Sequence, residues 1–214
     1  MSELPPEQPP AEPEMAATTT PEPGADHPVR LVVTDDLQRS RLTVLFRLLL
    51  AIPHLIWLTL WTIAVFFVVI VAWFAALIKG RLPDGMHGFL ASYLRYNTRV
   101  SAYWNLLADP YPPFNGSTDV TYPVDLHVDP PQAQARWKIF LRFILAIPAQ
   151  ILAWVFGQVL GIIAFLGWFV CLFIGRMPKG MRDLGVYCLR YQQQTYGYLM
   201  LLTQRYPSLS GPTP

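Results

Sequence analysis

Acidic residues are scarce in most of this chain. No glutamate follows Glu22, and the two longest apolar runs, residues 42–78 and 137–174, contain neither Asp nor Glu. A transporter coupled to protons or cations usually needs a carboxylate inside the membrane. The composition of these runs therefore counts against that class of protein.

Residues that carry chemistry are scarce as well. The two cysteines, Cys171 and Cys188, have neither metal-ligand spacing nor a disulfide framework, so we expect small buried side chains. The sequence has no glycine-rich phosphate loop, nucleophile elbow or paired carboxylates. His54 is the only histidine in an apolar run, and it has no acidic partner there, so packing or an interfacial hydrogen bond is expected. The prediction is a protein that is not an enzyme and has no cofactor or metal site.

The N-terminal segment contains no basic residue. Residues 1–27 carry six acids and seven prolines but no Lys or Arg, which predicts a disordered acidic, proline-rich tail and no cleaved signal peptide. Such a tail is either a solvated leader or a segment that binds a partner. A second disordered segment is expected at residues 209–214.

The rest of the chain is basic and apolar. All 16 basic residues, 13 of them Arg, share residues 30–214 with eight Asp, a formal charge of 16 − 8 = +8. Apolar residues make up 53% of the chain and charged residues 14%, against about 25% charged in a soluble domain. We expect contact with a bilayer that carries anionic head groups, and no binding of nucleic acid.

An internal repeat organises residues 28–208. The run Leu50-Ala51-Ile52-Pro53 recurs as Leu145-Ala146-Ile147-Pro148, a shift of 148 − 53 = 95 residues. The same shift carries the Gly-Arg-Leu-Pro-Asp-Gly-Met segment at 80–86 onto Gly-Arg-Met-Pro-Lys-Gly-Met at 175–181. One register without a gap indicates duplication. We assign the first membrane repeat to residues 28–116 and the second to residues 122–208.

Three parts follow one another in each repeat. Alternating apolar residues at 29–33 and 124–128 predict short strands. The long apolar runs come next. Apolar residues in steps of three and four then predict amphipathic interfacial helices at about 86–108 and 181–203. The predicted fold class is an all-α membrane protein with two tandem repeats.

The length of each apolar run leaves two topologies open. As one helix, residues 42–78 would span about 55 Å, against a hydrocarbon core of about 30 Å. Each run is therefore either a transmembrane helical hairpin or a helix kinked near Pro53 or Pro148 with a single crossing. Basic residues flank both ends of both runs, which favours the hairpin, a multi-pass protein and cytoplasmic termini. Gly157 and Gly161 would supply one turn; Thr59–Thr62 offers a weaker one.

Six arginines are candidate contacts for lipid phosphate or a partner, because the planar guanidinium group suits phosphate. Two lie just inside the apolar runs, two in the Gly-Arg-x-Pro turns and two on the amphipathic helices: Arg47, Arg142, Arg81, Arg176, Arg95 and Arg190. Arg47 and Arg142 also have a structural interpretation as interfacial anchors, and Arg81 and Arg176 as parts of a turn.

The ordered motifs resemble a bacterial membrane family known as domain of unknown function 4389. They comprise Arg47, Ala51-Ile52-Pro53-His54, Trp73-Phe74, Gly80-Arg81-Leu82-Pro83, Leu94-Arg95-Tyr96 and Tyr111-Pro112-Pro113-Phe114. The second copy departs at Ala149, where the first has His54, and at Ser208, where it has Pro113. The resemblance implies no activity and no catalytic residue.

Together with the family resemblance, which implies a bacterial inner membrane, these patterns predict a membrane protein that acts as a scaffold or accessory subunit in contact with anionic lipid. Other membrane proteins, or further copies of the chain, are the other expected partners. The alternative is an oligomeric channel or transporter, since two hairpins related by a pseudo-two-fold axis could line a path.

Overall fold

The computed structural model describes residues 27–210. Predictions for the acidic tail lie outside these residues except at His27, and those for the C-terminal end except at Leu209 and Ser210. The first repeat forms β1 (Val29–Val33), α1 (Arg41–Lys79) and α2 (Asp84–Trp104). The second forms β2 (Val124–Val128), α3 (Arg136–Ile174) and α4 (Lys179–Leu199). Each element begins 95 residues after its counterpart (124 − 29, 136 − 41 and 179 − 84), which confirms the repeat.

The predicted helical hairpins are wrong. α1 and α3 are each one continuous helix of 39 residues, and Pro53 and Pro148 lie inside them. At the expected turn in α1, the hydroxyl groups of Thr59 and Thr62 donate to carbonyl groups four residues earlier, at 2.7 Å. Such local bonds let a polar residue remain inside an apolar helix.

Gly157 lies inside the continuous helix α3 and faces a side chain of α4. A Cβ atom at this position would lie 2.8 Å from Nε2 of Gln192 on α4. That amide donates to the carbonyl oxygen of Ala153 at 3.2 Å. The glycine therefore allows α4 to approach α3 closely.

Glycine and proline fix the ends of the long helices as the sequence predicts. Gly80 and Gly175 have φ angles of 72° and 77°, a left-handed conformation that a glycine adopts with little strain. Their amides donate to Ala76 and Cys171 at 2.8 Å. Pro83 and Pro178 then precede α2 and α4.

A two-stranded antiparallel sheet joins the two repeats. β1 and β2 pair in a register that sets Leu31 opposite Leu126, its own counterpart in the repeat. Trp73 donates to the carbonyl oxygen of Ile139, and Trp168 to that of Val44, both at 3.0 Å. These reciprocal contacts relate the repeats by a pseudo-two-fold axis through the sheet.

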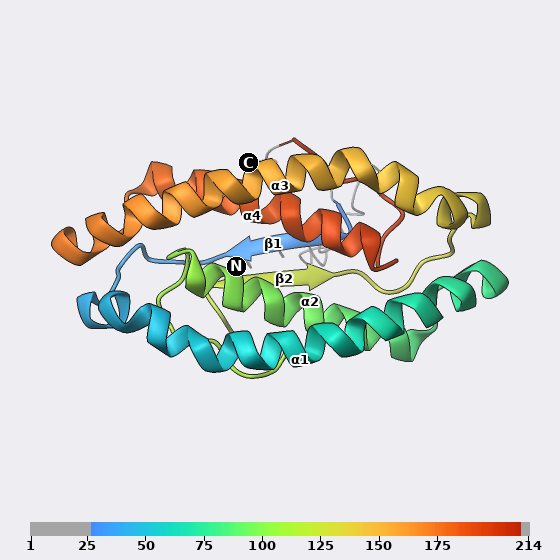
Figure 1. The fold of residues 1–214 in the computed structure, drawn as a ribbon, viewed down its shortest axis with the longest axis horizontal. Coiled ribbons are helices and arrows are strands. Elements are labelled where there is room, and N and C mark those ends of the chain that lie inside the picture. The colour runs from blue at the N-terminus through green and yellow to red at the C-terminus, as the bar shows by residue number, and fades with distance from the viewer. Residues whose placement is uncertain (1–26, 211–214) are drawn as a thin grey trace, which may run out of the picture.

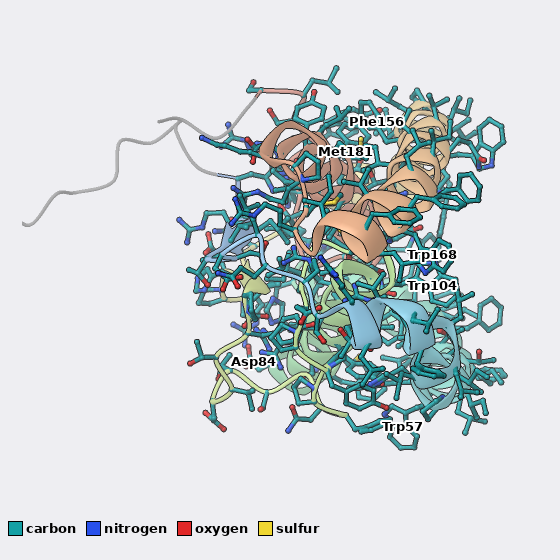
Figure 2. All side chains as sticks on the ribbon, turned by 90° about the vertical axis from the view of Figure 1, so that its left-hand side faces the viewer. Trp57, Asp84, Trp104, Phe156, Trp168 and Met181 are labelled. Carbon is teal, nitrogen blue, oxygen red and sulfur yellow. The ribbon has the colours of Figure 1, made fainter. Side chains whose placement is uncertain are left out.

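The elements form three layers. Figure 1 shows α1 and α3 running in opposite directions along the longest axis, with the strands midway along it. In the view along that axis, the strands, the α2/α4 pair and the α1/α3 pair follow one another across the molecule (Figure 2). α2 and α4 are therefore a middle layer, which differs from the interfacial position that their amphipathic pattern suggested.

Candidate functional site

The outer face of α1 and α3 is apolar along its whole length. Exposed large side chains extend from Leu42 to Ile78 on α1 and from Trp137 to Ile174 on α3. In the most apolar 18 residues of each helix, only 11% of α1 and 22% of α3 are buried. Figure 2 shows this face almost entirely as carbon, whereas nitrogen and oxygen gather around the strands and loops. A core helix of a soluble protein would be mostly buried.

Exposed basic side chains lie at both ends of this apolar face. Arg41, Arg176 and Lys179 lie at the end where α1 begins and α3 ends. Lys79, Arg81 and Arg136 lie at the end where α1 ends and α3 begins. Of the six arginines predicted as contacts, the structure thus places Arg81 and Arg176 beside the apolar face. The other four bases entered the sequence argument only as flanks of the apolar runs.

Contacts between the repeats hold the bases in position. Arg176 forms an isolated β-bridge with Gln38, and Arg81 forms the equivalent bridge with Ala133. The guanidinium group of Arg136 donates to the carbonyl oxygen of Ile78, near the C-terminus of α1, at 3.1 Å. A cation is favourable there because the helix dipole is negative at that end.

The two Gly-Arg-x-Pro turns differ in charge at the residue after the proline. Arg81 lies 3.5 Å from the carboxylate of Asp84, and both side chains are exposed. The residue equivalent to Asp84 in the second repeat is Lys179. The turn that contains Arg176 is therefore the more basic of the two.

Arg47 and Arg142 point into the protein, away from the lipid-facing positions considered for them. Arg142 is 1% exposed and donates to the carbonyl oxygens of Tyr198 and Thr203 and to Oε1 of Gln134. Its guanidinium carbon lies 4.6 Å from the centre of the Tyr198 ring. Arg47, 2% exposed, makes the equivalent contacts with the carbonyl oxygens of Tyr103 and Ala108 and with the Tyr103 ring, but its third partner is the carboxylate of Asp109. Both side chains tie a long helix to the end of the next helix.

The side chain of Arg95 is also buried in the protein. It donates to the carbonyl oxygens of Leu126 on β2 and Gly116. Burial lowers the pKa of Arg95, while the nearby carboxylate of Asp125 acts in the opposite direction. Arg190 is half-buried, lies over the ring of Tyr187 and donates to the carbonyl oxygen of Ser210. Neither side chain lies on the α1/α3 face.

His54 packs among aromatic rings. It is fully buried, its Nδ1 lies 2.7 Å from the Tyr96 hydroxyl, and its ring stacks on Phe114 at 4.2 Å between centroids. Among residues 27–210, no three His, Cys, Asp or Glu side chains gather as metal ligands would. The contacts of His54 are those of a packed core side chain.

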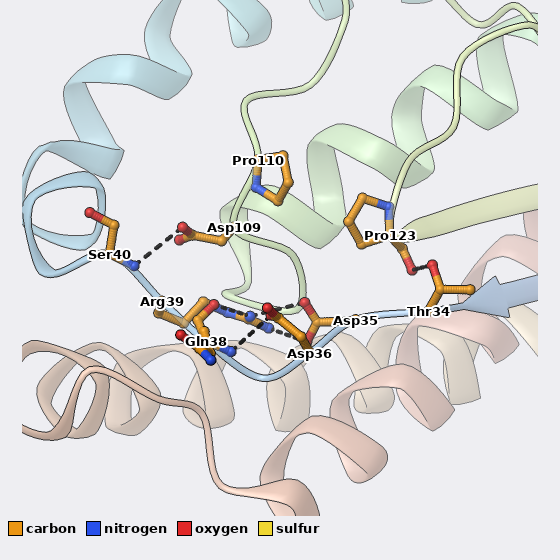
Figure 3. Close-up of a pocket in the computed structure, with 9 residues that line it drawn as sticks. All are labelled: Thr34, Asp35, Asp36, Gln38, Arg39, Ser40, Asp109, Pro110 and Pro123. Atoms are coloured by element: carbon orange, nitrogen blue, oxygen red, sulfur yellow. Dashed lines mark hydrogen bonds and ion pairs between the residues drawn. The ribbon is translucent and has the colours of Figure 1, made fainter.

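A polar cavity of about 570 Å³ lies where β1 leads into α1 (Figure 3). Asp35 forms an ion pair there with Arg39, at 2.6 Å. Asp109 accepts hydrogen bonds from the Ser40 amide, the Thr43 hydroxyl group and Arg47, at 3.0–3.2 Å. Sequence reasoning missed this network, because nothing in the chain links Asp109 to residues nearly 70 positions earlier. Both carboxylates are used to fix the start of α1.

A family model confirms the resemblance seen in the motifs. The model described as "Domain of unknown function (DUF4389)" matches residues 41–115 and again residues 136–210, well over half of the chain. The chain belongs to this family. The DUF4389 matches begin with α1 and α3, so the two strands lie outside them. No curated protein and no solved structure matches the chain.

Proposed function

We propose that this DUF4389 protein is embedded in a membrane through the outer face of α1 and α3. We further propose that it has a non-enzymatic role as a scaffold or accessory subunit. The basic residues at both ends of the apolar face contact anionic head groups, and the α2/α4 and strand layers face the cytoplasm, where they are available to other proteins.

One observation carries the proposal: two helices of 39 residues present exposed apolar side chains from end to end. Exposed apolar patches on soluble monomers rarely exceed a few hundred Å². Removal of such a face from water is favourable by roughly 25 cal/mol per Å² of apolar surface. Acyl chains supply an environment of matching extent.

The polar groups of the chain support a structural role. The buried arginines bond to backbone carbonyl groups, and Asp35 and Asp109 are held in hydrogen bonds and ion pairs. Such groups stabilise the packing of helices. A scaffold needs a rigid body and surfaces that other proteins can reach, and the contacts between the repeats provide the rigidity.

Flotation of the full-length protein with vesicles tests this proposal. Protein dialysed out of detergent in the presence of vesicles should float with both neutral and anionic phosphatidylglycerol-containing vesicles, since apolar burial operates in both. Binding at limiting lipid should be tighter to the anionic vesicles, and added salt should remove that difference. Protein that stayed in the dense fractions as a monodisperse species would contradict the proposal.

A further inference from the structure

Resting on the membrane association proposed above, we infer that the molecule lies flat in one leaflet. α1 and α3 would then run parallel to the membrane plane without crossing the bilayer. The apolar face would be covered by lipid acyl chains, because it inserts about 5–10 Å into the outer part of the acyl-chain region, as other interfacial helices do.

The length of the apolar face is the first argument. The exposed fraction is 67% at Leu42 and 73% at Ile78, so the lipid-facing surface reaches both ends of α1. A helix of 39 residues is about 58 Å long, nearly twice the hydrocarbon thickness of about 30 Å. An upright helix would leave apolar turns in water. A helix in the membrane plane covers every exposed position.

The sheet is the second argument. β1 and β2 lie midway along the long axis of the molecule (Figure 1), so an upright molecule would carry them to the centre of the bilayer. A two-stranded sheet has an open edge on each strand, and open edges do not occur exposed to lipid. With the long axis in the membrane plane, the sheet remains on the aqueous side.

The polarity of the opposite face is the third argument. A protein that crosses a bilayer is apolar around its whole circumference at the depth of the acyl chains. Here the strand side carries the partly exposed ion pair of Arg30 and Asp129 and the exposed side chain of His127. Among residues 27–210, the α1/α3 side carries exposed apolar side chains along the length of the molecule. In the view along the long axis, nitrogen and oxygen gather on the opposite side (Figure 2). One apolar face and one polar face fit a water–lipid boundary.

The bases at the two ends complete the argument. Arg41 and Arg176 lie at one end of the long helices, and Lys79 and Arg136 lie about 58 Å away at the other, by the helix rise per residue. A single crossing would place one of these pairs on the far side of the membrane, against the usual preference of Lys and Arg for the cytoplasm. In the flat orientation both pairs reach the head groups of one leaflet.

Cysteine accessibility tests the orientation in full-length protein. Single cysteines at Ser40→Cys, Leu60→Cys and Lys79→Cys mark the start, middle and end of α1, and all three positions are exposed. The native Cys171 and Cys188 are buried and would be changed to Ala. Ala135→Cys, Val155→Cys and Ile174→Cys mark the equivalent positions of the second repeat, 95 residues later. An impermeant maleimide is applied to spheroplasts and to inside-out vesicles, and total thiol is measured in SDS.

The flat orientation predicts that S40C and K79C react in inside-out vesicles and are protected in spheroplasts, while L60C reacts in neither. S40C and K79C reactive on opposite sides would show a single crossing and overturn the inference. L60C reactive from the periplasmic side would show a hairpin and also overturn it. In both cases the membrane association would stand. Soluble dimers with L60C protected would show a second copy on the apolar face and overturn both proposals.

Discussion

Arg47 and Arg142 each carry a charge inside an apolar helix. Backbone carbonyl groups at the end of the next helix in the chain accept hydrogen bonds from each guanidinium group. The pair is a structural repeat as well as a sequence repeat, since Tyr103 and Tyr198 occupy equivalent places beside the guanidinium groups. The sequence places both arginines near the ends of apolar runs. It does not show that the ends of α2 and α4 fold back to meet them.

Replacement of Arg142 should destabilise the protein strongly. Arg142→Ala leaves the carbonyl oxygens of Tyr198 and Thr203 and the amide oxygen of Gln134 buried without their donor. At about 1–3 kcal/mol for each unsatisfied group, the free energy of unfolding should fall by about 3 kcal/mol or more. Urea unfolding in detergent, followed by circular dichroism, measures the change. The exposed Arg176→Ala should change it by less than about 0.5 kcal/mol. Equal effects of the two variants would contradict this role.

His87 should make stability depend on pH. Burial lowers the pKa of His87, although the backbone of Asp129 and the carboxylate of Asp84 oppose the shift. The unfolded chain therefore binds the proton more readily, so the contribution of His87 is present above a pH of about 6.5 and is lost as the pH falls below it. His87→Gln should reduce the loss of stability between neutral pH and mildly acidic pH. An unchanged pH profile would show that His87 does not contribute.

At the scale of elements, the ends of the long helices follow from local chemistry. Gly80 and Gly175 adopt positive φ angles, and the prolines after them prevent a continuous helix. Gly175→Ala should therefore lower the free energy of unfolding by about 1 kcal/mol. Gly88→Ala is the matched control: Gly88 lies inside α2 with open space around its Cα, so the change should raise stability by about 0.5–1 kcal/mol. Thermal unfolding in detergent measures both. Stabilisation by Gly175→Ala would contradict the assigned turn.

Helix lengths could not be predicted because an apolar helix and an apolar hairpin have the same composition. Gly157 and Gly161 suggested a turn in α3, yet Gly157 makes room for Gln192 of α4. Bases at both ends of each run led us to expect that both ends lie on the same side of the membrane. The flat orientation proposed here meets that condition without a turn.

The amphipathic seams of α2 and α4 were visible in the sequence, but their surroundings were not. Tyr96 contacts His54 of α1, as expected for a seam residue. Arg95, off the seam, was expected to contact lipid phosphate or a partner, and its side chain instead donates to a carbonyl oxygen of β2. A pattern of apolar residues identifies one buried side of a helix. It does not show that a short sheet covers the other side.

At the scale of the molecule, duplication made the architecture predictable. The constant shift of 95 residues gave the order of elements, and the two strands pair across the repeats. Duplication does not predict the differences between the two repeats. Asp35, Asp36 and Asp109 line the cavity beside α1, whereas the second repeat has Pro130, Pro131 and Gln204 at these positions.

Charge removal on the two faces should have different effects on membrane binding. Arg176→Gln should weaken binding to anionic vesicles by about fivefold, since a base near an anionic surface contributes about 1 kcal/mol. Arg30→Gln removes the same charge from the strand face and should have little effect, because that face lies beyond the range of the surface potential. Vesicle titration at about 0.1 M salt, where the Debye length is about 10 Å, measures both. Equal losses would show that only net charge matters.

The most direct test of the account is the environment of the apolar face in the membrane. Spin labels at Phe66→Cys on α1, Phe165→Cys on α3 and Val32→Cys on β1, all exposed positions, can be probed with oxygen and with a water-soluble nickel complex. In vesicles, the account predicts that the labels at positions 66 and 165 are reached by oxygen and shielded from nickel, while the label at position 32 is open to nickel. Labels at 66 and 165 that nickel reaches as readily as the label at 32 would contradict it.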